Sequence, residues 1–367
     1  MKKFICPYCL TRHTEADLIY RCTAQNCTYK VPRGENGIIP YKYVPTCTKK
    51  CDQRFLAFCP HPSSQGQKII PPNAMNQSMS LALLGGRNSG KSNYIAILVN
   101  EIKRKMALPF NCSIKESDDS TQTRYDEYFY KPIFKGNRPL DSTSSGRQDP
   151  LLFSVDFYRN NRILDSLLLP LYDTAGENIE NQAVLMENAN YILNAGGIIL
   201  LLDPFEIEEI TDVLKENGVR LPNVQAEKME NILNRLQILL QRGDSKKVIQ
   251  TPIAIVLTKL DLLTDYSTLI PEDSPLRREC THLADGGFSK REFTAVDSAV
   301  RELLNGCSEA SNLFMKLKAF KNAAFFAVTS FGCDPEMSDL KRSMKPRRVL
   351  DPLLWLLAIN GYIKTVR

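Results

Sequence analysis

The sequence predicts an α/β fold, in which a mostly parallel sheet carries helices on both faces and follows a small cysteine-rich domain. Three observations support this prediction. Continuous apolar runs of strand length, such as residues 197–202 (GIILLL), alternate with segments of helical spacing, as in buried parallel sheets with crossover helices. A glycine-rich turn follows the first of these runs. Seven of the eleven cysteines lie between Cys6 and Cys59.

The chain divides into three segments. Residues 1–62 are short pieces broken by Pro, Gly and paired Cys, and predict a small domain without a helical period. Residues 63–77 (SSQGQKIIPPNAMNQ) are polar, contain a Pro-Pro pair and predict a linker. Residues 78–367 predict the α/β domain.

Strands and helices are expected to alternate within the third segment. The expected strands are residues 79–84, 151–157, 167–172, 197–202, 251–257 and 323–328, and the expected helices are 92–106, 178–194 and 352–364, with further helical patterns up to about residue 241. Residues 107–149 show no period and are rich in Ser, Thr, Asp and Tyr. Such a stretch is typical of a long loop or insertion with a function of its own.

The turn after the first strand fits the phosphate-loop pattern G-x-x-x-x-G-K-[ST]. Its residues are Gly85, Gly86, Arg87, Asn88, Ser89, Gly90, Lys91 and Ser92. The glycines let backbone N–H groups converge on phosphate oxygens, and the positive end of the following helix faces the same point. Lys91 would reach the β- and γ-phosphates, and the Ser92 hydroxyl would bind Mg²⁺. The alternative is a chance glycine-rich turn, which the flanking strand and helix patterns disfavour.

Two later tetrapeptides favour a guanine nucleotide over an adenine nucleotide. Asp173-Thr-Ala-Gly176 matches D-x-x-G, in which the Asp holds Mg²⁺ through water and the Gly N–H touches the γ-phosphate. Thr258-Lys259-Leu-Asp261 matches [NT]-K-x-D. The Asp261 carboxylate can accept two hydrogen bonds from the N1–H and the amine of guanine, a pair that adenine lacks, while the Lys259 stem lies along the base.

These three motifs, in this order and each at the end of a strand, resemble the Ras-like, translation-factor-related class of P-loop GTPases. The resemblance covers about residues 78–335. It implies a Ras-like sheet, GTP and GDP as ligands, and a guanine-contacting loop after the last strand, where Ser330 matches the family pattern. With the zinc-ribbon-like segment and the late DPLLWLL, the chain is also similar to the double-GTPase group of bacterial conflict systems.

The sequence departs from the family pattern at the positions that bear on hydrolysis. The Mg²⁺-binding switch threonine should lie in 107–149, where Thr121 and Thr123 are the candidates. Glu177 occupies the place of a water-positioning Gln, so slow or externally assisted hydrolysis is expected. Asn88 matches the loop Asn of potassium-activated GTPases, with a plain turn residue as the alternative. The candidate catalytic residues are therefore Lys91, Glu177 and Asn88, with K⁺ as a candidate cofactor.

The N-terminal cysteines predict two closed zinc sites. The shortest spacings group Cys6, Cys9, Cys22 and Cys27 in one site and Cys47, Cys51, Cys59 and His61 in the other, although interleaved pairing remains open. His13 is a spare candidate that we interpret as a surface residue. A segment with so few large aliphatic residues needs metal to fold. The alternative reading is a set of free cysteines.

Charge and composition limit the choice of partners. Residues 1–77 hold eleven Lys and Arg against four Asp and Glu, a net charge of +7, and the whole chain carries +6. Zinc-bound thiolates would cancel about half of that charge, so docking of a protein partner is favoured over nucleic-acid binding. No membrane span or secretory signal is visible, which predicts a cytoplasmic protein with reduced thiols.

Three functional hypotheses follow from the sequence. The first is a GTP-binding switch with slow or regulated Mg²⁺-dependent hydrolysis, whose zinc domain docks a protein partner. The second is an RNA- or ribosome-associated GTPase, whose zinc domain binds RNA. The third is a nucleotide-bound scaffold that hardly hydrolyses.

Overall fold

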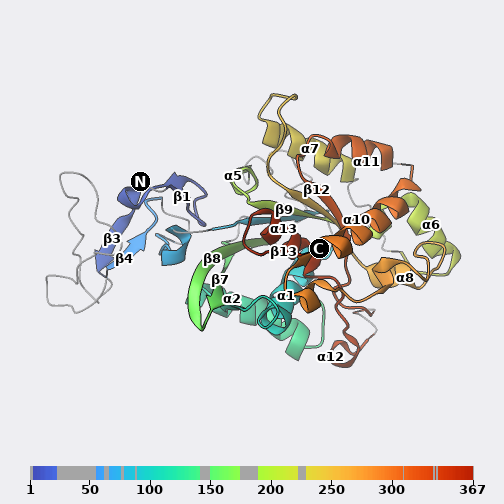
Figure 1. Ribbon diagram of the computed structural model, residues 1–367, viewed down its shortest axis with the longest axis horizontal. Helices are drawn as coiled ribbons and strands as arrows, with labels where there is room; N and C mark the ends of the chain where they lie inside the picture. The colour runs from blue at the N-terminus through green and yellow to red at the C-terminus, as the bar shows by residue number, and fades with distance from the viewer. Residues whose placement is uncertain are drawn as a thin grey trace.

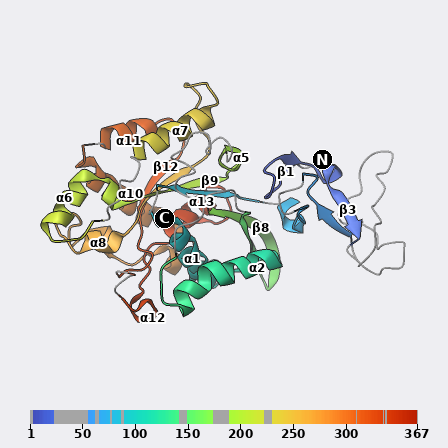
Figure 2. The same ribbon diagram turned by 180° about the vertical axis from the view of Figure 1, so that it is seen from behind.

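The computed structural model describes most of the chain (Figure 1). The described residues are 3–22, 55–61, 66–75, 78–86, 89–140, 149–173, 189–221, 229–308, 310–333, 335 and 338–366. They form an α/β domain with a small N-terminal module at one end, and the chain turned by 180° shows the same arrangement (Figure 2).

The described residues of the α/β domain build a seven-stranded sheet in the order β12-β10-β9-β5-β8-β7-β6. The strands are β5 (Leu81–Gly85), β6 (Cys112–Glu116), β7 (Leu151–Arg159), β8 (Arg162–Asp173), β9 (Gly197–Leu202), β10 (Ile253–Leu257) and β12 (Ala323–Ala327). Neighbours from β8 to β12 pair in parallel, whereas β7 and β6 extend the sheet antiparallel. The prediction of a mostly parallel sheet is confirmed.

Helices cover both faces of this sheet, with α1 and α2 on one side and α7 and α11 on the other (Figure 1). The helices are α1 (Lys91–Glu101), α2 (Asp119–Tyr125), α5 (Ala189–Leu193), α6 (Glu208–Glu216), α7 (Met229–Gln241), α8 (Leu260–Thr264), α9 (His282–Asp285), α10 (Lys290–Asn305), α11 (Ala310–Leu317), α12 (Leu340–Ser343) and α13 (Asp351–Ile359). Because both faces are covered, every residue of β9 and β10 is buried, which explains their uninterrupted apolar sequences.

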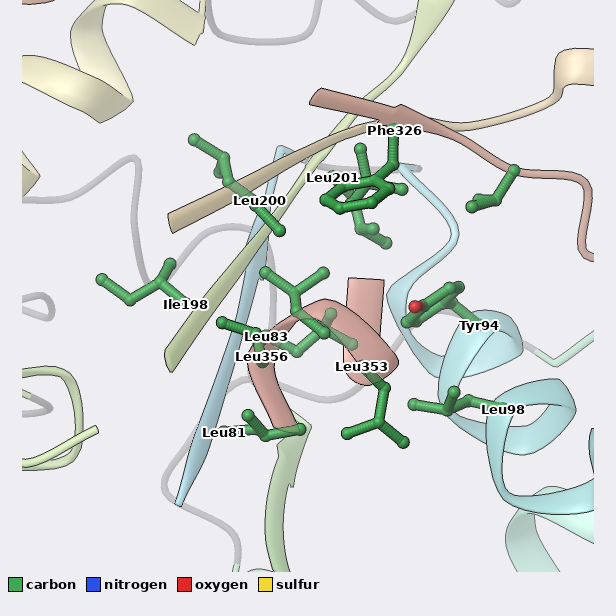
Figure 3. Close-up of a cluster of buried hydrophobic side chains, with 14 of the residues drawn as sticks. Leu81, Leu83, Tyr94, Leu98, Ile198, Leu200, Leu201, Phe326, Leu353 and Leu356 are labelled. Carbon is green, nitrogen blue, oxygen red and sulfur yellow. The ribbon is translucent and has the colours of Figure 1, made fainter. Parts of the chain in front are cut away.

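The C-terminal helix α13 belongs to the core. Leu353 and Leu356 gather with Leu81 and Leu83 of β5, beside Leu98 of α1 (Figure 3). A Cβ at Gly197 would lie 2.6 Å from Leu356 Cδ2, so this glycine lets α13 approach the sheet closely. The Tyr94 hydroxyl of α1 donates to Val349 O at 2.9 Å, just before α13. The late apolar segment therefore completes the α/β domain.

The described part of residues 107–149 is not the loop that the sequence predicts. It contains the edge strand β6, helix α2 and a π-helix, η5 (Asp126–Lys135), while a shorter π-helix, η4 (Ile102–Met106), extends α1. Tyr125 lies at 3% exposure with its hydroxyl donating to Ala96 O of α1. Phe129 and Ile133 of η5 are buried as well. Short elements and π-helical turns show no clean 3.6-residue period, which is why the sequence pattern missed them.

The N-terminal module consists of two small antiparallel sheets, β1 (Phe4–Ile5) with β2 (Arg12–His13), and β3 (Ile19–Cys22) with β4 (Phe55–Phe58). Its core includes Leu152 and Leu168 from the β7–β8 hairpin. The described part of the expected linker is packed as well. Its 3₁₀ turn η3 (Pro72–Met75) buries Met75 and joins Asn73 Nδ2 to Ser154 Oγ at 2.9 Å. The module is thus seated on the hairpin.

The remaining described elements are short. They are η1 (Glu15–Asp17), η6 (Pro204–Glu206), η7 (Pro275–Arg277), β11 (Phe288–Ser289) and β13 (Thr365–Val366), the last two forming a parallel pair. None of the described helices combines the length and the apolar character needed to cross a bilayer.

Candidate nucleotide site and metal centre

The glycine-rich turn connects the end of β5 to the start of α1. A Cβ at Gly85 would lie 2.6 Å from Ser89 Oγ and 2.9 Å from Leu201 O, so the close approach of loop and strand requires glycine. Gly90 caps α1 at φ 83°, in the left-handed region that L residues avoid. Ser89 Oγ donates to Gly86 O at 2.9 Å and closes the turn. The loop thus curls at the positive end of α1.

Lys91 points back into this loop. Its side chain is nearly buried, and the residue is 7% exposed. Its Nζ donates to Gly85 O at 3.0 Å and to Gly86 O at 2.8 Å. The ammonium group therefore lies at the mouth of the loop, where a phosphate chain would meet both its charge and the backbone N–H groups.

Ser92 and Asp173 meet at the same edge of the sheet. The Ser92 hydroxyl donates to Asp173 Oδ2 at 2.8 Å. Asp173 ends β8, and Leu83 of β5 is its partner in the parallel pair. Because parallel strands finish at one edge, two residues 81 positions apart form one polar pair. A hydroxyl and a carboxylate are the oxygen ligands that Mg²⁺ takes beside phosphates.

The expected base-binding residues follow β10 at the same edge. Lys259 adopts φ 53°, and its Nζ lies 2.6 Å from Asp203 Oδ2 and 4.4 Å from the Phe205 ring centroid. Asp203 is 4% exposed, directly follows β9 and is the N-cap of η6. Sequence reasoning missed Asp203 and Phe205, although an Asp directly after a buried strand is a signal that points to this edge.

Asp261 lies in the first turn of α8. Burial raises the pKa of its carboxyl above the ordinary value, and Asp265 adds to that rise. The backbone N–H of Asp261, Thr329 and Arg347 counteract it. Thr329 is fully buried at the end of β12, and Ser330, the predicted guanine-loop residue, follows it half-buried. The carboxyl group is thus largely shielded from water, where its ionised form needs hydrogen-bond donors or a positive charge nearby.

The two candidate switch threonines lie on α2. The Thr121 hydroxyl is buried and accepts a hydrogen bond from Leu152 N at 3.0 Å, and its own N–H donates to Asp118 Oδ1. Thr123 is exposed. These contacts give Thr121 a place in the packing of α2 on β7. A later residue of the same segment, Leu140, contacts α1, the helix that follows the phosphate loop: its N–H donates to Asn93 Oδ1 at 2.9 Å.

Several predicted site residues lie outside the described part of the chain. They are Arg87, Asn88, Gly176, Glu177, Cys27, Cys47 and Cys51. Their predicted roles stay predictions.

Cysteine and histidine side chains converge in the N-terminal module. The ligand atoms of Cys9, His13, Cys59 and His61 all lie within 4.8 Å of one another. Cys6 joins them, because its thiol is within hydrogen-bond contact of Cys59 and Cys9. Three sulfurs with imidazole nitrogens are a donor set that suits Zn²⁺. We call these five residues the metal knuckle.

The ionisation of these thiols fits a metal site. Contact with Cys59 and Cys6 lowers the pKa of the Cys9 thiol, whereas contact with Cys59 and Cys9 raises that of Cys6. The neighbouring sulfurs therefore favour a thiolate at Cys9, and the thiolate is the form that binds metal.

The predicted grouping of the cysteines is wrong for the described residues. Cys59 and His61 join Cys6 and Cys9, and Cys22 does not close that site. Cys22 pairs with Phe55 at the far end of the β3–β4 ladder, whereas Ile19 pairs with Phe58 next to Cys59. Since strands rise about 3.3 Å per residue, the ladder separates Cys22 from the knuckle by roughly 10 Å. The convergence of Cys9 with Cys59 and His61 favours interleaved pairing, the alternative left open.

His13 is buried, which contradicts the prediction of a surface residue. It is 5% exposed, and its Nε2 lies 3.2 Å from Cys9 Sγ. Its ring centroid is 5.3 Å from that of His61. His13 lies four positions after Cys9 in the sequence, and the turn after Cys9 brings β2 back beside the cysteine pair.

Residues 7–10, in the turn around Cys9, contact the α/β domain. Pro7 O accepts a hydrogen bond from the Tyr172 hydroxyl at 2.6 Å, one residue before Asp173. The Tyr8 hydroxyl donates to Asp118 Oδ2, the N-cap of α2, at 3.2 Å. Leu10 O accepts from Asn194 Nδ2 at 3.1 Å, just after α5. The turn that carries the candidate metal ligands Cys6 and Cys9 thus touches three elements of the α/β domain.

Comparisons with known proteins agree with this geometry. A family model described as Double-GTPase 2 matches residues 80–313. A curated relative from Mycolicibacterium smegmatis, named putative ESX-1 scaffolding and assembly protein SaeC, is 24% identical over 313 residues, which is 78% of this chain and 76% of the relative.

Two solved structures are similar over about half of their own chains. One is Methanosarcina barkeri Roco2 RocCORdC bound to GDP, at 13% identity and a TM-score of 0.29, covering 78% of this chain and 50% of that chain. The other is the Saccharomyces cerevisiae Ski7 GTPase-like domain bound to GTP, at 16% identity and a TM-score of 0.34, covering 77% and 50%.

Proposed function

Because the chain belongs to the Double-GTPase 2 family, we propose that it binds GTP and GDP with Mg²⁺ and acts as a nucleotide switch with slow, regulated hydrolysis. The observation that carries this proposal is the meeting of Lys91, the Ser92–Asp173 pair and Asp261 at one edge of the sheet. Lys91 would neutralise the phosphates, Ser92 and Asp173 would hold Mg²⁺, and Asp261 would accept from guanine.

Base choice tests the proposal directly. Replacing Asp261 by Asn removes an acceptor and adds a donor, so GTP binding should fall at least tenfold while binding of xanthosine triphosphate improves. Equilibrium titration with both nucleotides measures this exchange, with ATP as the reference. Equal binding of ATP and GTP by the unaltered protein would refute the assignment of residues 258–261.

Hydrolysis is the part of the proposal that depends on residues outside the described chain. By their places in the sequence motifs, Glu177 would add a negative charge near the γ-phosphate, and Asn88 would belong to a monovalent-cation site. We expect slow single-turnover hydrolysis that is faster in K⁺ than in Na⁺. Turnover in neither salt, together with tight GTP binding, would favour a nucleotide-bound scaffold.

The hypothesis of a nucleotide-bound scaffold is supported by the comparison with a curated relative. The curated relative carries scaffolding and assembly in its name, although at 24% identity. On this basis we propose that the partner is a protein. The N-terminal module would present its outer surface to that partner, while its inner surface lies on the β7–β8 hairpin. RNA binding by the full chain that weakens steeply with salt would instead favour the RNA-associated alternative.

We also propose that the metal knuckle binds Zn²⁺ through Cys6, Cys9, Cys59 and one imidazole. The convergence of the ligand atoms supports it. The metal would fasten the turn that carries Pro7 and Tyr8 against the α/β domain. Cys22 would then belong to a second site with cysteines outside the described residues.

A further inference from the structure

The β7–β8 hairpin ends in a tight turn, far from the nucleotide site. Asn160 and Asn161 form this turn at φ 50° and φ 59°, the left-handed conformations that a two-residue hairpin loop favours. Asp173 lies at the other end of the 12-residue strand β8. Since strands rise about 3.3 Å per residue, roughly 35 Å of strand separates the turn from this proposed Mg²⁺ ligand. A molecule that contacts the turn therefore leaves the nucleotide site open.

Two large aliphatic side chains are exposed beside this turn. Ile163 is 56% exposed and Leu164 is 68% exposed. Ile163 pairs with Tyr158 in the ladder, and the register shift between Phe157 and Tyr158 leaves Leu164 as the extra residue. Such a bulge changes the direction in which a side chain points. The backbone of the hairpin thus holds both aliphatic groups in water.

A third exposed aliphatic residue lies next to the hairpin. Leu108 is 94% exposed, and its carbonyl accepts a hydrogen bond from Asn111 N at 3.3 Å. Asn111 is bonded to Tyr158 twice, because its carbonyl accepts from Tyr158 N at 2.8 Å and its Nδ2 donates to Tyr158 O at 2.6 Å. Neighbouring strands lie about 4.8 Å apart, so Asn111 is about 10 Å from Ile163 across β7. Leu108 therefore belongs to the same surface as Ile163 and Leu164.

Three exposed arginines surround these aliphatic residues. Arg159 and Arg162 face each other as the last pair of the β7–β8 ladder, one on each side of the turn. Like charges directly opposite each other destabilise a ladder, so this pair favours an anion nearby. Arg104 of η4 is exposed four positions before Leu108. We define the hairpin-tip surface by these three arginines together with the three aliphatic residues Leu108, Ile163 and Leu164.

The positive charge of the hairpin-tip surface is only partly compensated. None of its three arginines forms an ion pair within the described part of the chain, and the nearby Glu116 and Glu101 are paired with Lys103 and Lys105. Asp165 has no ion pair among the described residues either, and it offsets one of the three arginine charges. The surface therefore combines exposed apolar groups with a net positive charge.

We propose that the hairpin-tip surface docks on an anionic lipid bilayer. Aliphatic side chains beside arginines suit the boundary between headgroups and acyl chains, because the aliphatic groups leave water there while the guanidinium groups meet lipid phosphates. The combination fits single-stranded RNA less well, since RNA-binding surfaces carry aromatic side chains that stack on the bases. The inference goes beyond the proposed nucleotide binding and does not depend on it.

The test is co-sedimentation of the full chain with vesicles of phosphatidylcholine, with and without phosphatidylserine. The unaltered protein should bind the vesicles with phosphatidylserine about tenfold more strongly, and added salt should weaken that binding. Arg159→Gln and Arg162→Gln should each weaken it about fivefold, because each removes a basic group near the anionic surface. Leu164→Ser should weaken it about tenfold, because an apolar side chain no longer leaves water.

Matched variants elsewhere on the chain serve as controls. Arg342→Gln removes an arginine of α12 whose side chain is 89% exposed, and Ile238→Ser removes an isoleucine of α7 that is 65% exposed. Both should bind the vesicles as the unaltered protein does. Thermal unfolding checks that each variant is folded, and Leu108→Ser replaces Leu164→Ser if the latter is not.

Several outcomes would overturn the inference. They are equal binding to vesicles with and without phosphatidylserine, binding to neither, and equal losses in the two controls. Losses in the arginine variants without a loss in Leu164→Ser would also overturn it, because no apolar group then enters the bilayer. If polyuridylate or polyglutamate binds with the same dependence on Arg159 while vesicles do not bind, the surface is a site for RNA or an acidic protein instead.

Discussion

At the residue scale, Lys259 is held in an unfavourable backbone conformation by the contacts of its side chain. A lysine at φ 53° lies in the left-handed region, which costs about 1 kcal/mol for a residue other than glycine. The contacts of its ammonium group with Asp203 and Phe205 hold it there. The strained turn directs the following residues, including Asp261, into the first turn of α8.

Asp203→Asn is therefore expected to weaken GTP binding without unfolding the protein. The amide keeps the size of the side chain but loses the charge that holds Lys259, so we expect a loss of about tenfold, or about 1.4 kcal/mol. Asp212→Asn is the matched control, because Asp212 and Lys215 form an exposed pair on α6. Equilibrium binding of GTP to both variants measures the effect, and equal affinities would contradict a role for Asp203.

At the element scale, β8 connects the two parts of the molecule. Asp173 at its end pairs with Ser92, and the hydroxyl of Tyr172 just before it donates to Pro7 O, next to Cys6 of the metal knuckle. Leu168, four residues earlier, lies in the core of the N-terminal module. Because successive side chains of a strand point to opposite faces, neighbouring residues of β8 can serve the nucleotide site and the module at the same time.

Metal content is the clearest test at this scale. Cys9→Ser and Cys59→Ser should each remove about one zinc per chain, and the double variant should remove no more than either alone, because both thiols serve one site. Cys307→Ser, at a half-buried cysteine away from the module, should leave the zinc content unchanged. Elemental analysis of the purified chains gives the result. If the double variant lost about two zinc ions per chain, one for each substitution, Cys9 and Cys59 would belong to separate sites, as the sequence grouping predicts.

At the scale of the whole molecule, the N-terminal module and the α/β domain are joined by polar and apolar contacts. The Lys68 ammonium lies 2.6 Å from the Asp149 carboxylate, and Asn73 bonds to Ser154. Leu152 and Leu168 complete the module's core. A metal bound by Cys6, Cys9 and His13 would therefore act on the end of β8, next to Asp173, and on the start of α2.

Removal of zinc is accordingly expected to weaken GTP binding, by roughly threefold to tenfold, since the knuckle supports β8 next to Asp173. Tyr172→Phe lacks the hydroxyl that bonds to Pro7. With zinc present, this variant should bind GTP more weakly than the unaltered protein, and its GTP affinity should fall less when zinc is chelated. Tyr158→Phe is the control, because its hydroxyl bonds to Ser113 at the other end of the hairpin. GTP titrations with and without chelator give the four comparisons. An equal response to chelation in both variants would show that the Tyr172–Pro7 contact does not couple the two parts.

The sequence by itself determined the fold class and where the site residues fall along the chain. Apolar runs of five or six residues, such as β9 and β10, identify buried parallel strands because both of their faces are covered. The three motifs follow the carboxyl ends of β5, β8 and β10, so Lys91, Ser92, Asp173 and Asp261 lie at one edge of the sheet. These features are local in sequence, and a pattern within a few residues is enough to find them.

Only the tertiary structure decided which distant residues meet. It grouped Cys59 with Cys6, because the β3–β4 ladder returns the chain to the first cysteine pair. It brought Asp203 to Lys259 and Arg347 to Thr329, across segments far apart in the sequence. It also folded residues 112–135 into a strand and helices that carry no clean period. Contacts of this kind depend on packing between elements, and packing has no signature in a short stretch of sequence.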